Sequence, residues 1–326
     1  MNTLLNLLIS AIVNGTPLMY GTLGEILTEK TGNLNLGVEG MMYMGGAIGL
    51  AGAFYYSKFA GANANGILAV IIAILLSFLA GAAAALIYSF ITISLRANQN
   101  VTGLALAIFG TGLGQFIGET MRVKEGGYIT VSNELKTYFY SSPFPAFLQN
   151  IPVVGKLIFG HSIFVYLGIL IACAMAFYIS KTRYGLNLRA VGESPATADA
   201  AGINIMKNKY LATVIGGGIS AIGGMVYIMT IAGGVWNHEG LAGEGWLAVA
   251  LVIFCLWRPL NAIWGSFLFG ALMILYLRLS LPIPSEIYKI LPYVVTVVVL
   301  VITSMRRKRE NQPPESLGIA YFREDR

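Results

Sequence analysis

The chain has 326 residues, of which 56% are hydrophobic and only 11% are charged, and its formal net charge is +6. Soluble domains carry about 25% charged residues, so this composition excludes a soluble globular protein. It predicts an all-α, polytopic transmembrane helical bundle. The basic excess comes from loop lysines and arginines between apolar segments, which excludes a nucleic-acid-binding surface.

The apolar pattern predicts a transmembrane domain over residues 1–305, with about nine spans, and a charged cytoplasmic tail over residues 306–326. A helical span needs about 20 apolar residues. Residues 14–17 read Asn-Gly-Thr-Pro, so we expect an irregular first piece and a span that starts only at Pro17. The nine expected segments are residues 17–27, 36–56, 67–95, 101–117, 162–180, 210–235, 244–256, 263–279 and 287–304.

Charge predicts the orientation of these segments. Loops rich in lysine and arginine stay on the cytoplasmic side of a membrane. The loop over residues 181–209 is basic, and the run Arg-Arg-Lys-Arg over residues 306–309 follows the last segment directly. With nine alternating segments, the N-terminus is then expected outside and the C-terminal tail inside.

The sequence predicts a short helix in the basic loop over residues 181–209, with capping residues that mark both of its ends. Ser194 is a good N-cap, Pro195 suits the first helical position, and Gly202 can adopt the left-handed conformation that ends a helix. A basic loop by itself is an ordinary cytosolic connector. Two defined ends favour a rigid element that contacts a partner instead. The basic residues of the loop are Lys181, Arg183, Arg189, Lys207 and Lys209.

Two short motifs suggest an internal repeat. Residues 35–42 read NLGVEGMM and open the second segment, and residues 237–247 read NHEGLAGEGWL and open the seventh. The two segments run in opposite directions in the predicted topology, as in inverted repeats of four spans each with the fifth span as an extra. Short or glycine-broken spans at matching positions of two halves indicate a transport site. The match covers few residues, so a chance similarity remains the alternative.

Several polar residues lie at or near membrane depth and are candidates for a substrate pathway. Placing a carboxylate inside a membrane costs roughly 2.5–3.5 kcal/mol of insertion free energy, so such a residue is a candidate for a functional role. Carboxylates and amides can bind hydroxyl groups, and tryptophan offers an apolar face. The alternative for Glu39 and Glu244, both near segment ends, is that they reach water or cap a helix. The pathway candidates are Asn35, Glu39, Asn98, Trp236, Asn237, Glu244 and Trp246.

Glycines recur on two of the expected segments. Gly110, Gly114 and Gly118 are spaced four residues apart in the fourth segment, and a second group lies in the sixth segment. Such spacing lets helices approach closely. It predicts close packing either inside this chain or against a partner. The second group is Gly216, Gly217, Gly218, Gly223 and Gly224.

Catalytic and metal-binding motifs are missing from the sequence. Gly155 and Lys156 lack the other residues of a P-loop, and neither GxSxG nor HExxH occurs. No second His or Cys stands at ligand spacing from His238, so we expect no metal site. The chain is therefore expected not to be an enzyme and to bind no cofactor. If it transports actively with ATP, the ATPase must be another chain.

Three blocks carry a resemblance to a known family. Residues 32–42, 96–103 and 185–203, which read GNLNLGVEGMM, RANQNVTG and GLNLRAVGESPATADAAGI, resemble bacterial ABC-importer permeases. The branch is that of simple-sugar and nucleoside permeases, within the ribose and branched-chain amino-acid permease family. The resemblance covers nearly the whole chain and is strongest to the smaller permease of nucleoside (guanosine-type) uptake systems. Ser194 differs mildly from the family pattern, because many relatives carry Asn at this position. Both residues can cap a helix.

This resemblance implies a bacterial plasma-membrane location, a nucleoside substrate and a set of partners. They are a second homologous permease chain, a cytoplasmic ATPase with two nucleotide-binding halves that holds ATP and Mg²⁺, and an extracellular substrate-binding lipoprotein. It also implies that the capped helix is a coupling helix that docks in a groove of the ATPase. The expected ATPase-coupling residues are Gly185, Arg189, Gly192, Glu193, Ser194, Pro195, Ala198 and Gly202.

Three alternatives remain open at this point. The same importer class can carry a simple sugar or an amino acid. A stand-alone secondary transporter is expected to keep ion-coupling carboxylates deep in several spans, whereas most carboxylates here lie near segment ends. A polytopic membrane enzyme needs a cluster of acid–base or metal-binding groups, which the sequence does not show.

Overall fold

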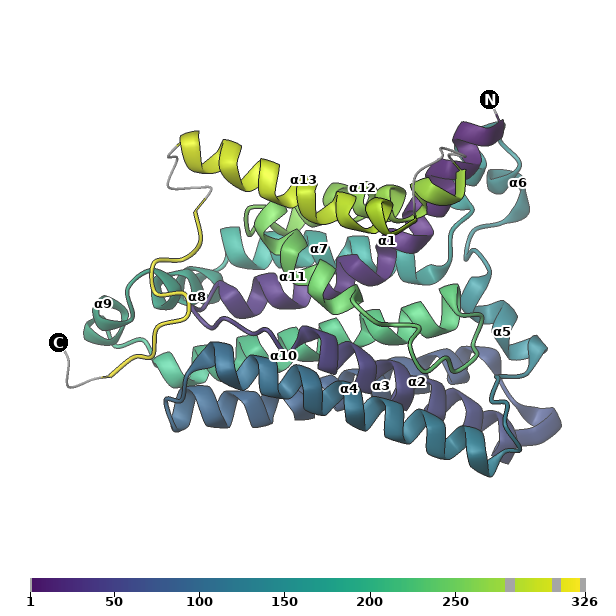
Figure 1. Cartoon of the computed structure of the whole chain (residues 1–326), viewed down its shortest axis with the longest axis horizontal. Coiled ribbons are helices and arrows are strands. Elements are labelled where there is room, and N and C mark those ends of the chain that lie inside the picture. The colour runs from purple at the N-terminus through teal and green to yellow at the C-terminus, as the bar shows by residue number, and fades with distance from the viewer. Residues whose placement is uncertain (1, 279–284, 307–311, 323–326) are drawn as a thin grey trace.

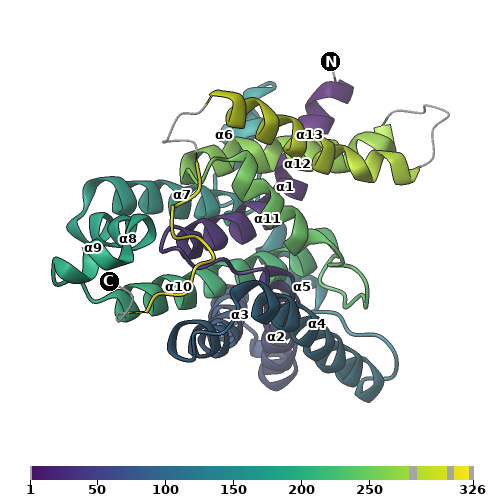
Figure 2. The same cartoon turned by 60° about the vertical axis from the view of Figure 1, so that its left-hand side comes forward.

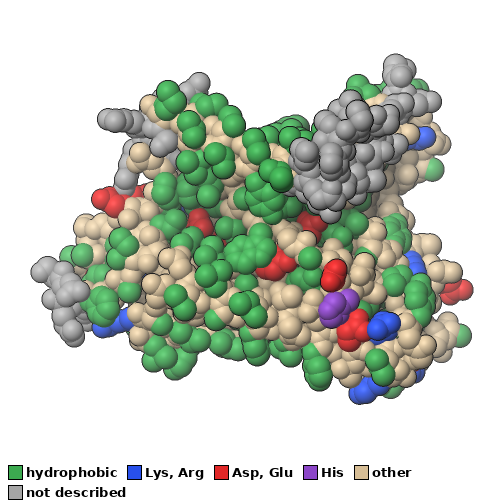
Figure 3. Space-filling model, viewed as in Figure 1, with side chains coloured by type: hydrophobic (Ala, Val, Ile, Leu, Met, Phe, Trp, Pro, Cys, Tyr) green, Lys and Arg blue, Asp and Glu red, His purple; other side chains and the backbone are tan. Residues whose placement is uncertain are grey.

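The structure, a computed structural model, describes residues 2–278, 285–306 and 312–322. Within these ranges it is built from helices, with no β-structure beyond one isolated bridge between Thr130 and Val235. The long helices lie side by side along the longest axis of the molecule (Figure 1). Hydrophobic side chains dominate the middle of the face seen in that view, and basic ones lie toward its two ends (Figure 3). The predicted all-α membrane bundle is confirmed.

Each of the nine predicted segments corresponds to a helix. By length and apolar composition, five described helices can cross a membrane, namely α1, α3, α4, α7 and α10, while α11 and the apolar stretches of α12 and α13 are shorter. The total number of spans therefore stays a prediction. The helices are α1 (Asn2–Glu29), α2 (Val38–Ala60), α3 (Gly66–Ser89), α4 (Gln99–Lys124), α5 (Asn133–Tyr140), α6 (Ala146–Gln149), α7 (Ile163–Lys181), α8 (Arg183–Glu193), α9 (Pro195–Ala200), α10 (Ile205–Val226), α11 (Glu244–Phe254), α12 (Pro259–Arg278) and α13 (Ser285–Arg306).

Helix α1 corrects one expectation. It is continuous from Asn2 to Glu29 and contains Pro17, so the predicted irregular first piece is wrong. The side chains of Asn14 and Thr16 donate hydrogen bonds to carbonyl groups one turn earlier, at 2.8 and 2.7 Å. A Cβ on Gly15 would collide with the Ser266 backbone of α12. The sequence that looked like a helix break is thus a close-packing surface, because neighbouring helices support a proline-containing membrane helix.

The spaced glycines of α4 serve contacts inside this chain. Gly110 lies against the backbone of Gly40, Gly114 lies against the backbone of Tyr43, and a Cβ on Gly118 would collide with the Trp236 ring. Helix α4 therefore packs tightly along α2, which settles the choice left open by the spacing.

Helix α10 occupies the centre of the bundle for the same reason. Gly216 lies against Gly24 of α1, Gly217 against Gly81 of α3, and Gly224 against the backbone of α2. Helix α10 packs directly against α1, α2 and α3. In Figure 2, α2, α3 and α4 lie on one side of α10, and α11 to α13 lie on the other. A motion of α10 would consequently displace the helices that it contacts directly, which are α1, α2 and α3.

The two ends of the molecule differ. Helices α8 and α9 and the described part of the tail lie at one end, and the N-terminus lies at the other (Figure 1). Tail residues 312–322 fold back on the bundle, since Gly318 N–H donates to Gly32 O at 3.1 Å and Ser316 N–H donates to Gly192 O at 3.0 Å. The basic run over residues 307–309 lies outside the described residues.

This arrangement allows a direct test of the predicted orientation. In a background with Cys173→Ser and Cys255→Ala, which removes both native thiols, we expect a cysteine at Asn2 to react with an impermeant maleimide in intact cells. A cysteine at Gln312, which is exposed in the structure, should react only after permeabilisation. Reaction of the Gln312 cysteine in intact cells would place the α8–α9 end outside.

Candidate functional site

The predicted loop over residues 181–209 is mostly helical. It contains α8, which the sequence did not predict, then α9 and the first turn of α10. Thr182 caps α8, because its Oγ1 accepts the N–H of Gly185 at 3.0 Å. Gly185 is buried so close to the carbonyl of Tyr178 that a side chain there would collide with it. These contacts fix the angle at which α8 leaves the membrane helix α7.

Helix α9 has the two defined ends that the sequence predicted. Ser194 Oγ accepts the N–H of Thr197 at 3.4 Å, and Pro195 occupies the first helical position. At the other end, Gly202 has φ +81°. Its N–H donates to Asp199 O at 2.9 Å, and Ile203 N–H donates to Ala198 O at 3.0 Å. This pair of bonds is a Schellman motif, so a helix of only six residues has few free backbone groups at its ends.

The predicted coupling residues divide into an anchoring set and an exposed set. Ala198 is 3% exposed and packs with Val191 and Ile205, so α9 is tied to α8 and to α10. The carbonyl of Gly192 accepts bonds from both the N–H and the Oγ of Ser316 in the tail, at 3.0 and 2.6 Å. The anchoring residues are Gly185, Gly192 and Ala198, Pro195 is half-buried, and Arg189, Glu193, Ser194 and Gly202 are exposed.

The junction beneath α8 is also charged. Gly192 abuts the carbonyl of Lys30 at the end of α1. Burial lowers the pKa of Lys30, against the opposing effect of the Glu193 carboxylate of α8, while the nearby Arg189 lowers it further. The end of α1, the tail and α8 therefore meet at one place. At this end of the bundle, α8 and α9 expose a polar surface, and the apolar cluster around Ala198 supports it from below.

Glu39 caps the start of α11, although it lies at the start of α2. Its Oε1 accepts the N–H of Gly243 at 2.8 Å, and its Oε2 accepts the N–H groups of Gly245 and Trp246 at 2.7 and 3.3 Å. A carboxylate satisfies the free N–H groups of a helix start and is stabilised by the helix dipole. The two Glu-Gly motifs thus meet in space. The geometry favours the structural reading of Glu39.

Glu244 is placed differently. Its side chain is 5% exposed, and its Oε2 has no hydrogen-bond partner in the described part of the chain. It lines a cavity of about 410 Å³ together with Asn14, Tyr227 and Tyr293, and the remaining walls are apolar apart from backbone groups. A pocket of roughly 300–1,000 Å³ with apolar walls and few polar groups is typical of a small-molecule site. Of the predicted pathway residues, Glu244 is the one that faces this cavity.

The other pathway candidates lie elsewhere and make local contacts. Asn35 Oδ1 accepts the N–H of Gly37 at 2.9 Å, and Asn98 Oδ1 caps α4 by accepting the N–H of Val101 at 3.1 Å. The Trp236 indole donates to Glu119 at 3.2 Å. Asn237 is exposed in the loop before α11, and Trp246 is half-buried in the first turn of α11. The structure does not gather these residues with Glu244 around one cavity.

Two buried carboxylates of α1 escaped the sequence analysis. Glu25 is 1% exposed and accepts the N–H of Asn35 at 2.9 Å. Glu29, 3% exposed, accepts the indole N–H of Trp257. Trp257 and Leu256 both have left-handed backbones, with φ of 53° and 55°, at the corner between α11 and α12. The sequence does contain a signal for them, because two carboxylates one turn apart on an apolar helix indicate a functional or structural role for both.

Comparison with known proteins gives a consistent result. Residues 7–300 match the family described as branched-chain amino acid transport system / permease component. The chain is 31% identical over 323 residues to the guanosine ABC transporter permease protein NupQ of Bacillus subtilis, which covers 96% of this chain and 95% of NupQ. It is 30% identical over 309 residues to the nucleoside ABC transporter permease protein NupC of Lactococcus lactis, with 92% of each chain covered.

A relative with a different substrate name is also similar. The putative glucose ABC transporter permease protein TsgC13 of Haloferax volcanii is 36% identical over 275 residues, which cover 83% of this chain and 77% of the relative.

Proposed function

The chain belongs to the family of branched-chain amino acid transport system permease components, and we propose that within an ABC importer it forms the pathway for nucleosides. It is a multi-pass membrane protein and a permease subunit of such an importer. The similarity to NupC and NupQ over more than nine-tenths of each chain carries the nucleoside assignment. A glucose-type sugar is the second candidate, because TsgC13 has the higher identity over a shorter region.

The cavity beside Glu244 supports a nucleoside. A nucleoside combines a ribose with hydroxyl donors and a flat base. The unpaired Glu244 Oε2 can accept a hydrogen bond from a hydroxyl group, and Asn14 can donate or accept one. Tyr227 and Tyr293 offer aromatic faces to the base. A transport pathway needs weak binding, since the substrate must leave, and this cavity has only a few polar groups.

The partners follow from the same proposal. A second homologous permease, a cytoplasmic ATPase with two nucleotide-binding halves and an extracellular substrate-binding lipoprotein complete the importer. ATP and Mg²⁺ bind to the ATPase, whereas this chain carries the substrate. The exposed residues Arg189, Glu193 and Ser194 provide the surface for the ATPase, and this surface is supported by the rigid α8–α9 pair.

The mechanism is rigid-body gating. When the ATPase halves close, α9 moves with them, because its capped ends keep it from fraying. The motion of α9 displaces α10 because Ala198 packs against Ile205 of α10. It also displaces the end of α1, because Gly192 of α8 lies against the Lys30 carbonyl. Helix α10 packs against α1, α2 and α3, so its displacement shifts the walls of the cavity. Glu39 holds the start of α11 in register with α2 during this motion.

Glu244→Gln tests the pathway assignment. The variant keeps the shape of the side chain, removes its negative charge and replaces one of its two acceptor oxygens with an amide donor. We expect guanosine uptake per assembled complex to fall about tenfold, the amount expected for roughly 1.4 kcal/mol of lost interaction, with no loss of assembled complex. Glu239→Gln, in the exposed loop before α11, is the matched control. Wild-type uptake per complex in Glu244→Gln would remove Glu244 from the pathway.

The substrate itself is tested on the reconstituted importer. ATP hydrolysis by the complete complex should be stimulated by guanosine with its binding protein and should not respond to glucose with the same binding protein. Stimulation by glucose alone would establish the second candidate. No stimulation by either compound would exclude both substrates.

A further inference from the structure

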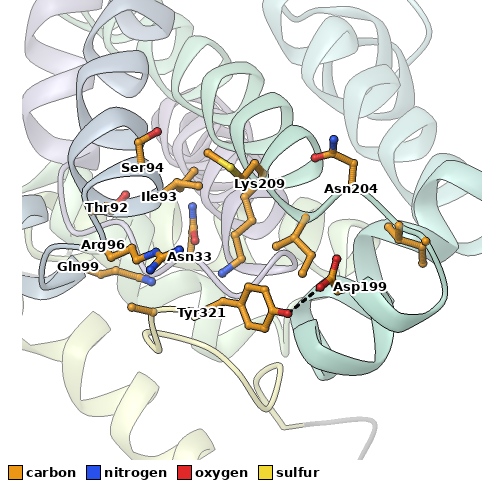
Figure 4. Close-up of a pocket in the computed structure, with 15 residues that line it drawn as sticks. Asn33, Thr92, Ile93, Ser94, Arg96, Gln99, Asp199, Asn204, Lys209 and Tyr321 are labelled. Carbon is orange, nitrogen blue, oxygen red and sulfur yellow. Dashed lines mark hydrogen bonds between the residues drawn. The ribbon is translucent and has the colours of Figure 1, made fainter. Parts of the chain in front are cut away.

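A second cavity of about 480 Å³ lies at the α8–α9 end of the bundle, away from the proposed substrate pathway. It is enclosed by residues 92–94 just after α3, the start of α4, the corner between α9 and α10, and the tail (Figure 4). Unlike the Glu244 cavity, it is lined by two basic side chains, Lys209 of α10 and Arg96 of the α3–α4 connection.

Lys209 is the feature that requires an explanation. Its side chain is 3% exposed, and it makes no hydrogen bond or ion pair with any described residue. A buried ammonium is costly unless it is paired. In Figure 4 the amino end of Lys209 is directed into the cavity, where Arg96, Gln99 and Asn33 also end. An anion that enters the cavity would therefore find an ammonium already desolvated.

The neighbouring groups add donors. Arg96 has φ +58°, and its guanidinium lies 4.7 Å from the ring centre of Phe322 in the tail, which holds it at the rim of the cavity. Gln99 uses its Oε1 to accept the N–H of Leu34 at 2.7 Å, so its amide nitrogen remains available as a donor. The one acidic side chain of the cavity wall, Asp199, accepts a bond from the Tyr321 hydroxyl at 3.0 Å.

Asn33 can adapt to the ligand. Its Nδ2 donates to Thr213 Oγ1 at 3.2 Å, and its buried Oδ1 has no partner among the described residues. A threonine hydroxyl can donate as well as accept, so the amide can turn and leave either its oxygen or its nitrogen without a partner beside the cavity. It can thus bind a phosphate oxygen or a hydroxyl group carried beside the phosphate.

We propose that Lys209, Arg96, Gln99 and Asn33 form a binding site for a phosphate group at the α8–α9 end of this permease. Phosphate suits the site because an ammonium, a guanidinium and an amide together supply more donors than a carboxylate can accept from one side. The group is carried either by a free cytosolic phosphate or by the headgroup of an anionic lipid. Once bound, it bridges the α3–α4 corner to α10, beside the residues that end α9.

The experiment uses the full chain in maltoside micelles that contain no phospholipid. In one arm, inorganic phosphate is titrated against chloride at equal ionic strength. In the other arm, phosphatidylglycerol is titrated against phosphatidylcholine. The melting temperature reports binding, and native mass spectrometry counts retained lipids. The variants are Lys209→Met, Arg96→Gln and the control Lys207→Met, which removes an exposed lysine of the same helix.

We expect phosphate or phosphatidylglycerol to raise the melting temperature of the wild type and of Lys207→Met. The apparent affinity should fall at least tenfold in Lys209→Met and severalfold in Arg96→Gln. Without ligand, Lys209→Met should melt at or above the wild-type temperature, because it removes an unpaired buried charge. If Lys209→Met does not fold, Arg96→Gln decides. The arm that shows the effect identifies the source of the phosphate. No shift in either arm, or equal shifts in wild type and both site variants, overturns the proposal.

Discussion

Gly202→Val is expected to reduce uptake per assembled complex at least tenfold, whereas Gly202→Asn should retain most of it. Gly202 has φ +81° and ends α9. A left-handed backbone costs an ordinary L-residue roughly 1–2 kcal/mol, β-branched residues are the least tolerant of it, and Asn visits it routinely. Valine should therefore unwind the end of α9 and detach the surface proposed for the ATPase.

The site is well suited to this comparison because no atom lies within 4 Å of a Cβ built on Gly202. An effect of valine that asparagine does not share then comes from the backbone conformation, because both side chains enter the same open space. Uptake, substrate-stimulated ATP hydrolysis and the amount of assembled complex are measured for both variants. Equal uptake in Gly202→Val and wild type, at equal assembly, would show that the capped end of α9 is not needed for coupling.

A pair of proline substitutions gives an independent check on the same helix. Ala198 N–H donates to Ser194 O at 3.0 Å, so Ala198→Pro removes a helical hydrogen bond. Ala196 is the second residue of α9, where proline is tolerated because its N–H would have no helical partner. Ala198→Pro should therefore abolish coupling, and Ala196→Pro should be mild. A similar loss in both would indicate an effect of the surface at Ala196 itself.

Glu39→Ala is expected to destabilise the protein by about 3 kcal/mol or more. The Glu39 carboxylate accepts three backbone N–H groups at the start of α11, and each buried donor left without a partner costs roughly 1–3 kcal/mol. Glu39→Gln keeps one acceptor oxygen in place, so it should lose about half as much stability. The free energy of unfolding in mixed micelles, obtained by titration with sodium dodecyl sulfate, measures the effect.

The control for Glu39 is again Glu239→Gln, which should leave the free energy of unfolding unchanged because this side chain lies in an exposed loop. For Glu39→Gln, guanosine uptake per assembled complex should remain near wild type. A loss of uptake at unchanged stability would instead assign Glu39 to the substrate pathway. The contrast with Glu244→Gln separates a helix cap from a pathway residue.

The sequence by itself determined what depends on local interactions. The apolar segments determined the helical membrane class, because a chain in a lipid bilayer must satisfy its own backbone groups. The ends of α9 were readable because the Ser194–Thr197 and Ile203–Ala198 bonds join residues three and five positions apart. Glycine spacing on α4 and α10 likewise predicted close packing, although not which helices would pack together.

Tertiary structure alone decided the roles that depend on distant residues. Pro17 predicted an irregular start, yet packing against α12 keeps α1 continuous. Glu39 and Glu244 looked equivalent in two similar motifs. Glu39 found backbone donors 204 to 207 positions away, while Glu244 was left with a free oxygen over a cavity. A buried carboxylate needs hydrogen-bond donors or water because of its chemistry, but only the path of the whole chain determines which donors come within hydrogen-bond distance.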